Sequence, residues 1–233
     1  MSGVAPFVVG VTGGIGSGKS TFCRLLEEAH GCPLLDADRL GHEALQPGST
    51  VFEAVLARFG DEIRGASGAI SRPALGALVF SDPAALSDLN ALVHPWILER
   101  IESRLAALKV SGYAGIVLLD AALLFDWLHR YRPDGIVLVV ASLDARLERL
   151  ERRGMDREEA LRRIESQTMF KWAAVDPTDA PAAGPTSAGG NPVPVDWVIE
   201  NSGSRADLVR RSREVWLEIE RRAARQHDLE DTR

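Results

Sequence analysis

Eight residues near the N-terminus have the types and the spacing that bind phosphate. Residues 13–20 read Gly-Gly-Ile-Gly-Ser-Gly-Lys-Ser and match the pattern G-x-x-x-x-G-K-[ST] at every position. Glycines let backbone N–H groups approach phosphate oxygens that a Cβ would keep away. Lys19 supplies a positive charge for the outer phosphates, and the Ser20 hydroxyl can ligate a magnesium ion. The stretch predicts a phosphate loop that binds a nucleoside triphosphate.

The segments on either side of this phosphate loop support the prediction. Residues 7–12 form an apolar run typical of a strand, and residues 21–29 have helical spacing with apolar Phe22, Leu25 and Leu26. The loop is therefore expected at a helix N-terminus, where unpaired N–H groups and the helix dipole favour an anion. The alternative, a glycine-rich turn with a chance Lys-Ser pair, would have to coincide with both flanking elements.

Two carboxylates, Asp36 and Asp38, end a second apolar run at residues 33–38. Ligands of open parallel sheets bind outside the carboxyl ends of the strands, so we expect these acids and the phosphate loop to face the same crevice. Strand alternation directs both side chains to one side, although only one need point at a substrate. The other interpretation is an exposed turn in which an Asp caps a helix.

Helical patterns replace strands between residues 40 and 110, and strands then return. A capping-box pattern predicts a helix capped at Thr50, and further helices are expected to begin at Pro73, Pro83 and Pro95. The pair His94-Pro95 is expected to separate the last two, because proline interrupts a helix. Further strands are expected at residues 116–120, 135–141 and 197–201, followed by a helix over residues 205–226. The pattern indicates an α/β protein with an inserted helical block.

Asp120 ends the third of the expected strands. An acid at this place could hold a magnesium-bound water, as in many phosphate-loop proteins, or could cap the following turn. The sequence leaves both possibilities open.

An arginine-rich pair of helices is expected between the fourth and fifth strands, with Gly154 between them. The seven arginines are Arg146, Arg149, Arg152, Arg153, Arg157, Arg162 and Arg163. Glutamates interleave with them, which is typical of a solvated face with weak surface ion pairs. The same arginines could form a lid over a triphosphate, because phosphoryl transfer needs cations near the developing charge. Both interpretations stay open on the residues alone.

Composition limits the possible partners. The 233 residues carry a formal net charge of -6, which argues against a general nucleic-acid binder. No window approaches the ~18 uninterrupted apolar residues of a membrane span, and we see no secretory signal. Cys23 and Cys32 lie outside any C-x-x-C pair and are expected to be free thiols. We expect a cytoplasmic protein, with a monomer favoured and with no nucleic-acid or membrane partner.

A set of short motifs along the chain resembles the dephospho-coenzyme A kinase family. In order, it comprises the phosphate loop, Asp36-Ala37-Asp38, His42, Pro47-Gly48, Arg72, Leu75-Gly76, Val79-Phe80, Leu89-Asn90, His94-Pro95, Leu123-Leu124-Phe125 and Asn201-Ser202-Gly203. The phosphate loop occurs in other kinases, whereas the ordered set is specific. The resemblance runs from about residue 8 to about residue 208.

This resemblance implies a fold and a reaction. The fold is a P-loop kinase core, a five-stranded parallel sheet with helices on both faces, together with an inserted helical substrate domain and a helical lid. The reaction is ATP-dependent phosphorylation of the 3′-hydroxyl of dephospho-CoA, the last step of coenzyme A synthesis, with Mg²⁺. By position, Asp38 matches the catalytic carboxylate, which accepts or orients the hydroxyl proton and holds magnesium together with Ser20.

The remaining site residues also follow from the resemblance. ATP contacts are implied for Gly14, Ile15, Gly16, Ser17, Gly18, Lys19, Ser20, Thr21, Asn201 and Gly203. Acceptor contacts are implied for Thr12, Asp38, His42, His94, Leu123 and Phe125. Alternatively, His94 caps a helix before Pro95, and Leu123 and Phe125 belong to the core. Lys19, Arg149 and Arg153 are the implied catalytic cations.

The chain departs from the family pattern at three places. The lid pattern Q-x-x-R has Arg146 at its Gln position, and a shorter turn makes Arg152 a rival of Arg153. The usual P-L-L-F-E reads Ala-Leu-Leu-Phe-Asp at residues 122–126. Residues 175–195 are a Pro- and Gly-rich insertion, expected to be flexible and cheap to close.

These expectations divide the chain into four segments. The nucleotide-binding core comprises residues 1–38, 113–141 and 196–233, and the helical CoA-binding insertion comprises residues 39–112. The lid is residues 142–172, and the flexible insertion is residues 175–195.

Two other functions share the phosphate loop. A different small-molecule kinase, acting for example on a nucleoside monophosphate, would keep the core and lid without requiring Asp38, His42 and His94-Pro95. A nucleotide-dependent switch would bind a partner instead of turning over a metabolite, but the guanine-specific N-K-x-D pattern is absent from the sequence.

Overall fold

The computed structural model describes residues 4–128, 130–167 and 195–231. The chain divides into two compact units. One comprises Met1–Leu35 and Leu108–Arg233, and we call it the sheet unit. The other, Asp36–Ala107, we call the helical unit. The expected insertion at residues 175–195 lies, apart from its last residue, outside the described residues.

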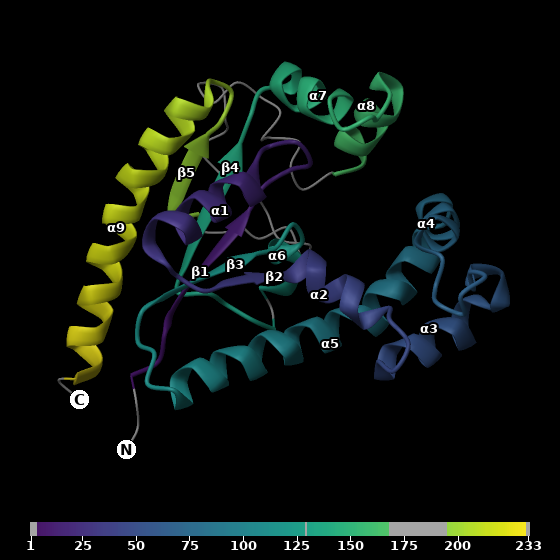
Figure 1. The fold of residues 1–233 in the computed structure, drawn as a ribbon, viewed down its shortest axis with the longest axis horizontal. Helices are drawn as coiled ribbons and strands as arrows, with labels where there is room; N and C mark the ends of the chain where they lie inside the picture. The colour runs from purple at the N-terminus through teal and green to yellow at the C-terminus, as the bar shows by residue number, and fades with distance from the viewer. Residues whose placement is uncertain (1–3, 129, 168–194, 232–233) are drawn as a thin grey trace. The chain divides into compact units, whose positions relative to one another are not determined.

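The sheet unit is built on one five-stranded parallel sheet with the order β2-β3-β1-β4-β5 (Figure 1). The strands are β1 (Phe7–Thr12), β2 (Leu34–Asp36), β3 (Ile116–Asp120), β4 (Gly135–Val140) and β5 (Trp197–Glu200). Every residue of β1, β3 and β4 is buried, which explains why these strands are uninterrupted apolar runs. β1 is central, so the loop that follows it lies between the ends of β3 and β4. The five-stranded parallel core expected from the sequence is confirmed.

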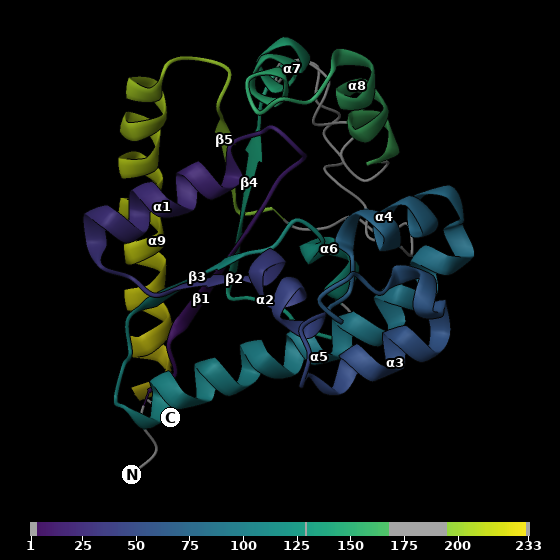
Figure 2. The ribbon, with the colours of Figure 1, turned by 45° about the vertical axis from the view of Figure 1, so that its right-hand side comes forward.

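Two helices cover one face of this sheet, α1 (Lys19–His30) and α9 (Arg205–Asp231) (Figures 1 and 2). The core on this face takes alternate residues of β1, Phe22 and Leu26 of α1, and Trp216 and Ile219 of α9. Burying each large apolar side chain stabilises the fold by about 1.5–3 kcal/mol. On the opposite face, a Cβ on Gly10 would lie 2.5 Å from Leu124 of the short helix α6 (Leu124–Trp127), so this glycine allows close packing.

Two further helices of the sheet unit follow β4, namely α7 (Leu143–Glu151) and α8 (Arg157–Ser166). Gly154 turns the chain between them with a φ of +86°, and the Asp156 side chain caps α8 by accepting from the Glu159 N–H at 2.9 Å. Leu147, Leu150, Ala160 and Ile164 form a small core between the two helices. The helical pair expected from the sequence is confirmed.

The helical unit contains α2 (Ala37–Ala44), α3 (Thr50–Phe59), the 3₁₀ turn η1 (Asp61–Ile63), α4 (Arg72–Ser81) and most of α5 (Pro83–Val110). Its helix starts follow ordinary capping chemistry. The Asp82 carboxylate accepts from the Ala84 N–H at the start of α5, and the Ser71 hydroxyl accepts from the Ala74 N–H in α4. In the described part of the chain, none of the helices has both the length and the apolar character that crossing a membrane requires.

Three expectations about local structure are wrong. Asp38 does not continue the second strand, because the chain enters α2 at Ala37. The helix expected to be capped at Thr50 is capped one residue earlier, where the Ser49 hydroxyl accepts from the Val51 N–H at 3.1 Å. The third error is the helix break at Pro95, since α5 runs unbroken through this residue.

Burial explains why α5 continues through Pro95. The proline is itself exposed, but Val93 precedes it and Trp96, Ile97 and Ile101 follow it as buried residues. Ending the helix at residue 94 would displace this apolar side from the interior. The burial of four side chains outweighs the ~3 kcal/mol that a proline costs in a helix interior.

Pro95→Ala is expected to raise the free energy of unfolding by about 1–2 kcal/mol. The substitution restores an N–H to the helix, and the greater freedom of alanine in the unfolded chain removes part of the gain. Urea unfolding followed by circular dichroism measures the difference. Ser103→Ala, at an exposed position of the same helix, is the control and should change stability by under about 0.5 kcal/mol. An unchanged or lower stability of Pro95→Ala would contradict this account.

Candidate active site

The phosphate loop connects β1 to α1 in a tightly turned conformation. Gly16 and Gly18 have φ values of +78° and +94°, a region that other residues rarely adopt. The Ser17 N–H donates to the Gly14 carbonyl at 3.0 Å, which closes the turn. Gly18 is the N-cap of α1 and offers no side-chain acceptor. The first N–H groups of α1 therefore lack a side-chain cap, as an anion site at a helix N-terminus requires.

Lys19 and Asp120 form a buried ion pair below this loop. Lys19 is 8% exposed and Asp120 2% exposed, and the Lys19 ammonium donates to Asp120 Oδ1. The contact arises because β3, which ends at Asp120, pairs with β1 directly. Removing one partner of a buried pair typically costs about 3–5 kcal/mol. Asp120 therefore holds the loop lysine, a role that neither sequence-based interpretation of this acid included.

Arg149 and Asn201 hold the outer side of the loop. Arg149 Nη1 donates to the Gly16 and Ser17 carbonyls, each at 3.1 Å, and its Nη2 donates to the Asn201 carbonyl. Asn201 Nδ2 donates to the Ser17 carbonyl at 2.7 Å. Burial, followed by the neighbouring positive charge of Arg152, lowers the pKa of Arg149. Two predicted site residues from distant segments thus meet at the phosphate loop.

A cleft of about 390 Å³ opens beside these residues. Six of its lining residues belong to the predicted site: Gly18, Thr21, Arg149, Arg153, Asn201 and Gly203. Arg152 lines the cleft too, so both rival arginines stand at the same wall. The cleft adjoins the loop and the start of α1, which is where a bound nucleotide would extend from its phosphates.

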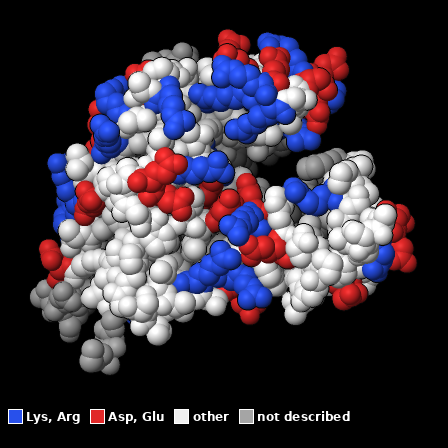
Figure 3. All heavy atoms as spheres, in the orientation of Figure 1, with Lys and Arg blue, Asp and Glu red and all other residues white. Residues whose placement is uncertain are grey.

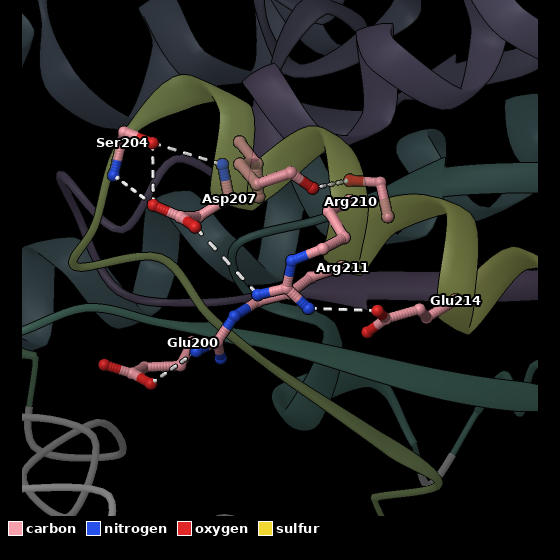
Figure 4. Close-up of polar contacts among 8 residues, drawn as sticks. Glu200, Ser204, Asp207, Arg210, Arg211 and Glu214 are labelled. Carbon is pink, nitrogen blue, oxygen red and sulfur yellow. Dashed lines mark hydrogen bonds and ion pairs between the residues drawn. The ribbon is translucent and has the colours of Figure 1, made fainter.

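The cap of α9, drawn in Figure 4, holds the turn that carries two residues of the cleft lining, Ser202 and Gly203. Ser204 donates to Asp207 Oδ2 from its N–H at 3.0 Å and from its hydroxyl at 2.6 Å, while the Asp207 N–H donates back to the Ser204 hydroxyl oxygen at 3.2 Å. These bonds from Ser204 lower the pKa of the Asp207 carboxyl. Arg211 pairs with Glu200 at 3.1 Å and ties the helix back to β5. The reciprocal cap fixes the turn that presents Ser202 and Gly203 to the cleft.

Most other arginines of α7 and α8 form ion pairs at the surface. Figure 3 shows basic and acidic side chains intermixed over α7 and α8. The ion pairs there are Arg152–Glu148, Arg157–Glu151, Arg162–Glu158 and Arg163–Glu159. Four of the seven arginines thus form surface pairs, as the first interpretation predicted, whereas Arg146 and Arg149 turn to the phosphate loop; the lid stays a prediction.

Three predicted site residues lie in the helical unit. Asp38 is exposed in the first turn of α2, and His42 is exposed one turn later. Residues four apart share one side of a helix, so both project from the same side of α2. Asp36 is the N-cap and accepts from the Arg39 N–H at 2.9 Å, which realises the capping alternative for this acid alone. His94 is half-buried within α5 instead of ending a helix.

Residues near the start of α6 complete the predicted set. Thr12 is buried, and its hydroxyl donates to the Ala122 carbonyl at 3.4 Å. Leu123 is 41% exposed, whereas Phe125 is 2% exposed. Phe125 thus matches its core alternative, and Leu123 offers an apolar side chain to a ligand.

Comparison with known proteins identifies the family. A family model for dephospho-CoA kinase matches residues 7–172. The chain belongs to the dephospho-CoA kinase family. A family member from Frankia casuarinae is 39% identical over 213 residues, 91% of this chain and 83% of that protein, and one from Geobacter sulfurreducens is 36% identical over 210 residues, 90% and 96%.

Solved structures share the fold of this chain. A crystal structure of a Thermus thermophilus protein is 34% identical, with a TM-score of 0.68 over 92% of this chain and 98% of that one. A dephospho-CoA kinase from Campylobacter jejuni, 22% identical, has the same fold, with a TM-score of 0.58 over 91% and 96%.

Within this dephospho-CoA kinase family fold, one site residue escaped the sequence analysis. Gln167, at the end of α8, accepts from the Ile15 N–H through Oε1 at 2.7 Å. Arg146 Nε donates to the carbonyl of the same residue at 2.8 Å. Arg146 stood out by its place in the lid pattern, but Gln167 is a lone polar residue after a helix, and no local pattern ties it to a loop 152 positions away.

Arg149→Met is expected to raise the dissociation constant for ATP about 10-fold or more and to lower the melting temperature. The change removes three donors and leaves the Gly16 carbonyl without its arginine partner. Calorimetric titration and a thermal melt measure the two effects. Arg162→Met on α8 removes only an exposed pair with Glu158 and should leave both values near those of the parent. Equal behaviour of the two variants would refute this role of Arg149.

Asp207→Asn is expected to destabilise the protein at neutral pH and to matter less in acid. The folded-state pKa of Asp207 lies below its ordinary value, so the carboxylate stabilises the fold above the ordinary pKa of about 3.9. That contribution disappears as the pH falls through the lowered pKa. Urea midpoints of the parent and the variant should therefore differ at pH 7 and converge toward pH 3. In a Ser204→Ala background, which removes the hydroxyl donor, the difference at pH 7 should shrink; an undiminished difference would assign the effect to other groups.

Proposed function

We propose that this protein transfers the γ-phosphoryl group of ATP to the 3′-hydroxyl of dephospho-CoA, giving coenzyme A and ADP. One observation above all supports the proposal: the phosphate loop, an arginine of α7 and the turn after β5 converge on a single cleft in a chain of the dephospho-CoA kinase family. The cytoplasmic location and the monomeric state expected from the sequence stay predictions.

The nucleotide half of the reaction is assigned to the sheet unit. Loop N–H groups and the N-terminus of α1 bind the phosphates, and Gly14 to Thr21 supply the contacts along the loop. Lys19 exchanges part of its interaction with Asp120 for the outer phosphates. Arg149 and Arg153 face the transferred group from the cleft wall, and Asn201 and Gly203 border the base.

An oxygen donor at the loop fits a magnesium ion. The Ser20 hydroxyl is exposed at the start of α1, directly after the lysine that pairs with Asp120. In the described residues no three His, Cys, Asp or Glu side chains gather as a metal cage, which suits a metal held by few protein ligands and by the nucleotide itself. We assign Ser20 and Asp38 as its protein ligands. When bound, Mg²⁺ neutralises charge on the phosphate oxygens.

Asp38 is assigned the role of general base, which accepts the proton of the 3′-hydroxyl of the acceptor. The 3′-oxygen attacks the γ-phosphorus while its proton passes to the Asp38 carboxylate, and the bond to the β–γ bridging oxygen breaks, so that ADP leaves with the electron pair. Asp36 caps α2, and Asp38 is exposed in the first turn of the same helix. His42 on the same side of α2, His94 of α5, and Thr12 and Leu123 of the sheet unit are assigned to the acceptor, whereas the buried Phe125 is assigned to the core.

ADP release from ATP and Mg²⁺ is expected only when dephospho-CoA is present, with a product heavier by one phosphate. AMP and CMP serve as control acceptors. A coupled ADP assay and mass spectrometry of the product measure the reaction. Stimulation by AMP or CMP alone would instead favour a nucleoside monophosphate kinase, and a lack of any stimulation would refute the assigned acceptor.

Asp38→Asn is expected to lower kcat by about 10²-fold or more while the ATP dissociation constant stays within about 2-fold, because the side chain acts on the acceptor hydroxyl. Steady-state kinetics and ATP titration measure the two quantities. Asp36→Asn is the matched control: it makes the same chemical change two residues earlier, and asparagine caps a helix as well as aspartate does. Similar losses in both variants would remove Asp38 from the catalytic role.

A further inference from the structure

Arg146 is the charged residue with the lowest exposure in the described part of the chain. It lies in α7 and is 1% exposed. The two other buried charged side chains, Lys19 and Asp120, pair with each other. No ion pair among the described residues includes Arg146, and its Nη2 is buried without a hydrogen-bond partner there. This arginine therefore carries a buried positive charge that no described acid offsets.

The side chain of Arg146 lies against the phosphate loop. Arg146 Nε donates to the Ile15 carbonyl at 2.8 Å. A Cβ on Gly14 would lie 2.7 Å from Arg146 Nη2, and a Cβ on Gly16 would lie 3.2 Å from the Arg146 Cβ. The absence of side chains at Gly14 and Gly16 thus makes room for Arg146 as well as for a phosphate. The guanidinium lies directly against the backbone that binds the anion.

Burial of an unpaired charge is unfavourable, and the pKa of Arg146 is lowered by it. An anion near the guanidinium offsets that cost, and the attraction is strong because little water intervenes. The other two cations at the loop have partners. Asp120 neutralises the charge of Lys19, and Arg149 donates hydrogen bonds to three carbonyl groups. Arg146 is the loop-contacting cation in the described structure that has neither an acid nor a full set of acceptors.

We propose that Arg146 is a phosphate-binding charge of this enzyme, acting on the phosphates of the nucleotide across the backbone of the loop. The nature of the nucleotide rests on the proposed function, whereas the site and its preference for polyphosphate do not. Nη2 is enclosed by the loop, so Arg146 attracts the phosphates by its charge and not by a direct contact.

Three variants separate charge from packing. Arg146→Gln keeps a donor for the Ile15 carbonyl and removes the charge; Arg146→Lys keeps the charge; Arg146→Met removes both. Tripolyphosphate, ATP with Mg²⁺ and adenosine are titrated by calorimetry into the full chain without any acceptor. For tripolyphosphate and ATP we expect the dissociation constant to rise about 10-fold in Arg146→Gln and Arg146→Met and under about 3-fold in Arg146→Lys. Adenosine affinity should not change.

Thermal melts supply a second, independent readout. Without ligand, Arg146→Gln should melt at or above the temperature of the parent, because the uncompensated charge is gone, while the stabilisation by tripolyphosphate should shrink. A merely structural Arg146 predicts the opposite: a lower melting temperature with unchanged tripolyphosphate affinity. Arg162→Gln, at an exposed position of α8, is the control and should match the parent.

Each outcome decides for or against the inference. Unchanged polyphosphate affinity in Arg146→Gln, or an equal loss in Arg146→Lys, overturns it. If Arg146→Gln does not fold, the comparison of Arg146→Lys with the parent still tests the inference. A dissociation constant for tripolyphosphate that is about 10-fold higher in Arg146→Lys would show that a positive charge at this position is not sufficient, and would overturn it. Polyphosphate binding that depends on Arg146, in a protein inactive toward dephospho-CoA, would uphold the inference and refute only the acceptor.

Discussion

A phosphate loop places a conflicting demand on its own backbone. Its N–H groups have to face an anion, so the carbonyl groups of the same peptides face away and need donors from elsewhere in the protein. Arg146 meets this need at Ile15, Arg149 at Gly16, and Arg149 with Asn201 at Ser17. These donors come from α7 and from the turn after β5. The architecture around the loop follows in large part from this need to satisfy three carbonyl groups.

The strand order makes the arrangement possible. β1 has β3 on one side, and β4 followed by β5 on the other. Donors to the loop carbonyls therefore come from the segments that follow β4 and β5, whereas the acid that holds Lys19 comes from β3. The phosphate loop at the end of β1 thus has an acid from β3 on one side, and arginine and amide donors from the segments after β4 and β5 on the other. β1 is the strand of this sheet with two strands on either side of it, so the loop that follows it can take donors from the segments after β4 and β5 and an acid from β3.

Local sequence patterns predicted the elements of this structure that depend on neighbouring residues, and they missed features that depend on burial or on contacts between distant residues. The phosphate loop, the five strands and the α7–α8 pair each depend on residues close in sequence, and all were predicted. The break at Pro95 was wrong because burial on both sides of the proline, which no local pattern shows, outweighs its helix penalty. The contacts of Gln167 and Asp120 join residues 152 and 101 positions apart, so residue type alone could not assign them. Asp38 was expected at the end of the second strand, but it lies in the first turn of α2.

The hydrogen bonds of Arg149 limit how the arginine-rich helices can move. If α7 swung away from the loop as a rigid body, the Gly16 and Asn201 carbonyls would lose their arginine donor while Ser17 kept Asn201, and each unpaired buried group costs about 1–3 kcal/mol. The Ile15 carbonyl would lose Arg146 in the same movement. Arg152 and Arg153, by contrast, are exposed at the cleft, and Arg152 pairs only with Glu148 among the described residues. A movement of arginines toward a nucleotide therefore costs the least free energy when α7 stays on the loop and only the exposed arginines at its C-terminal end change their partners.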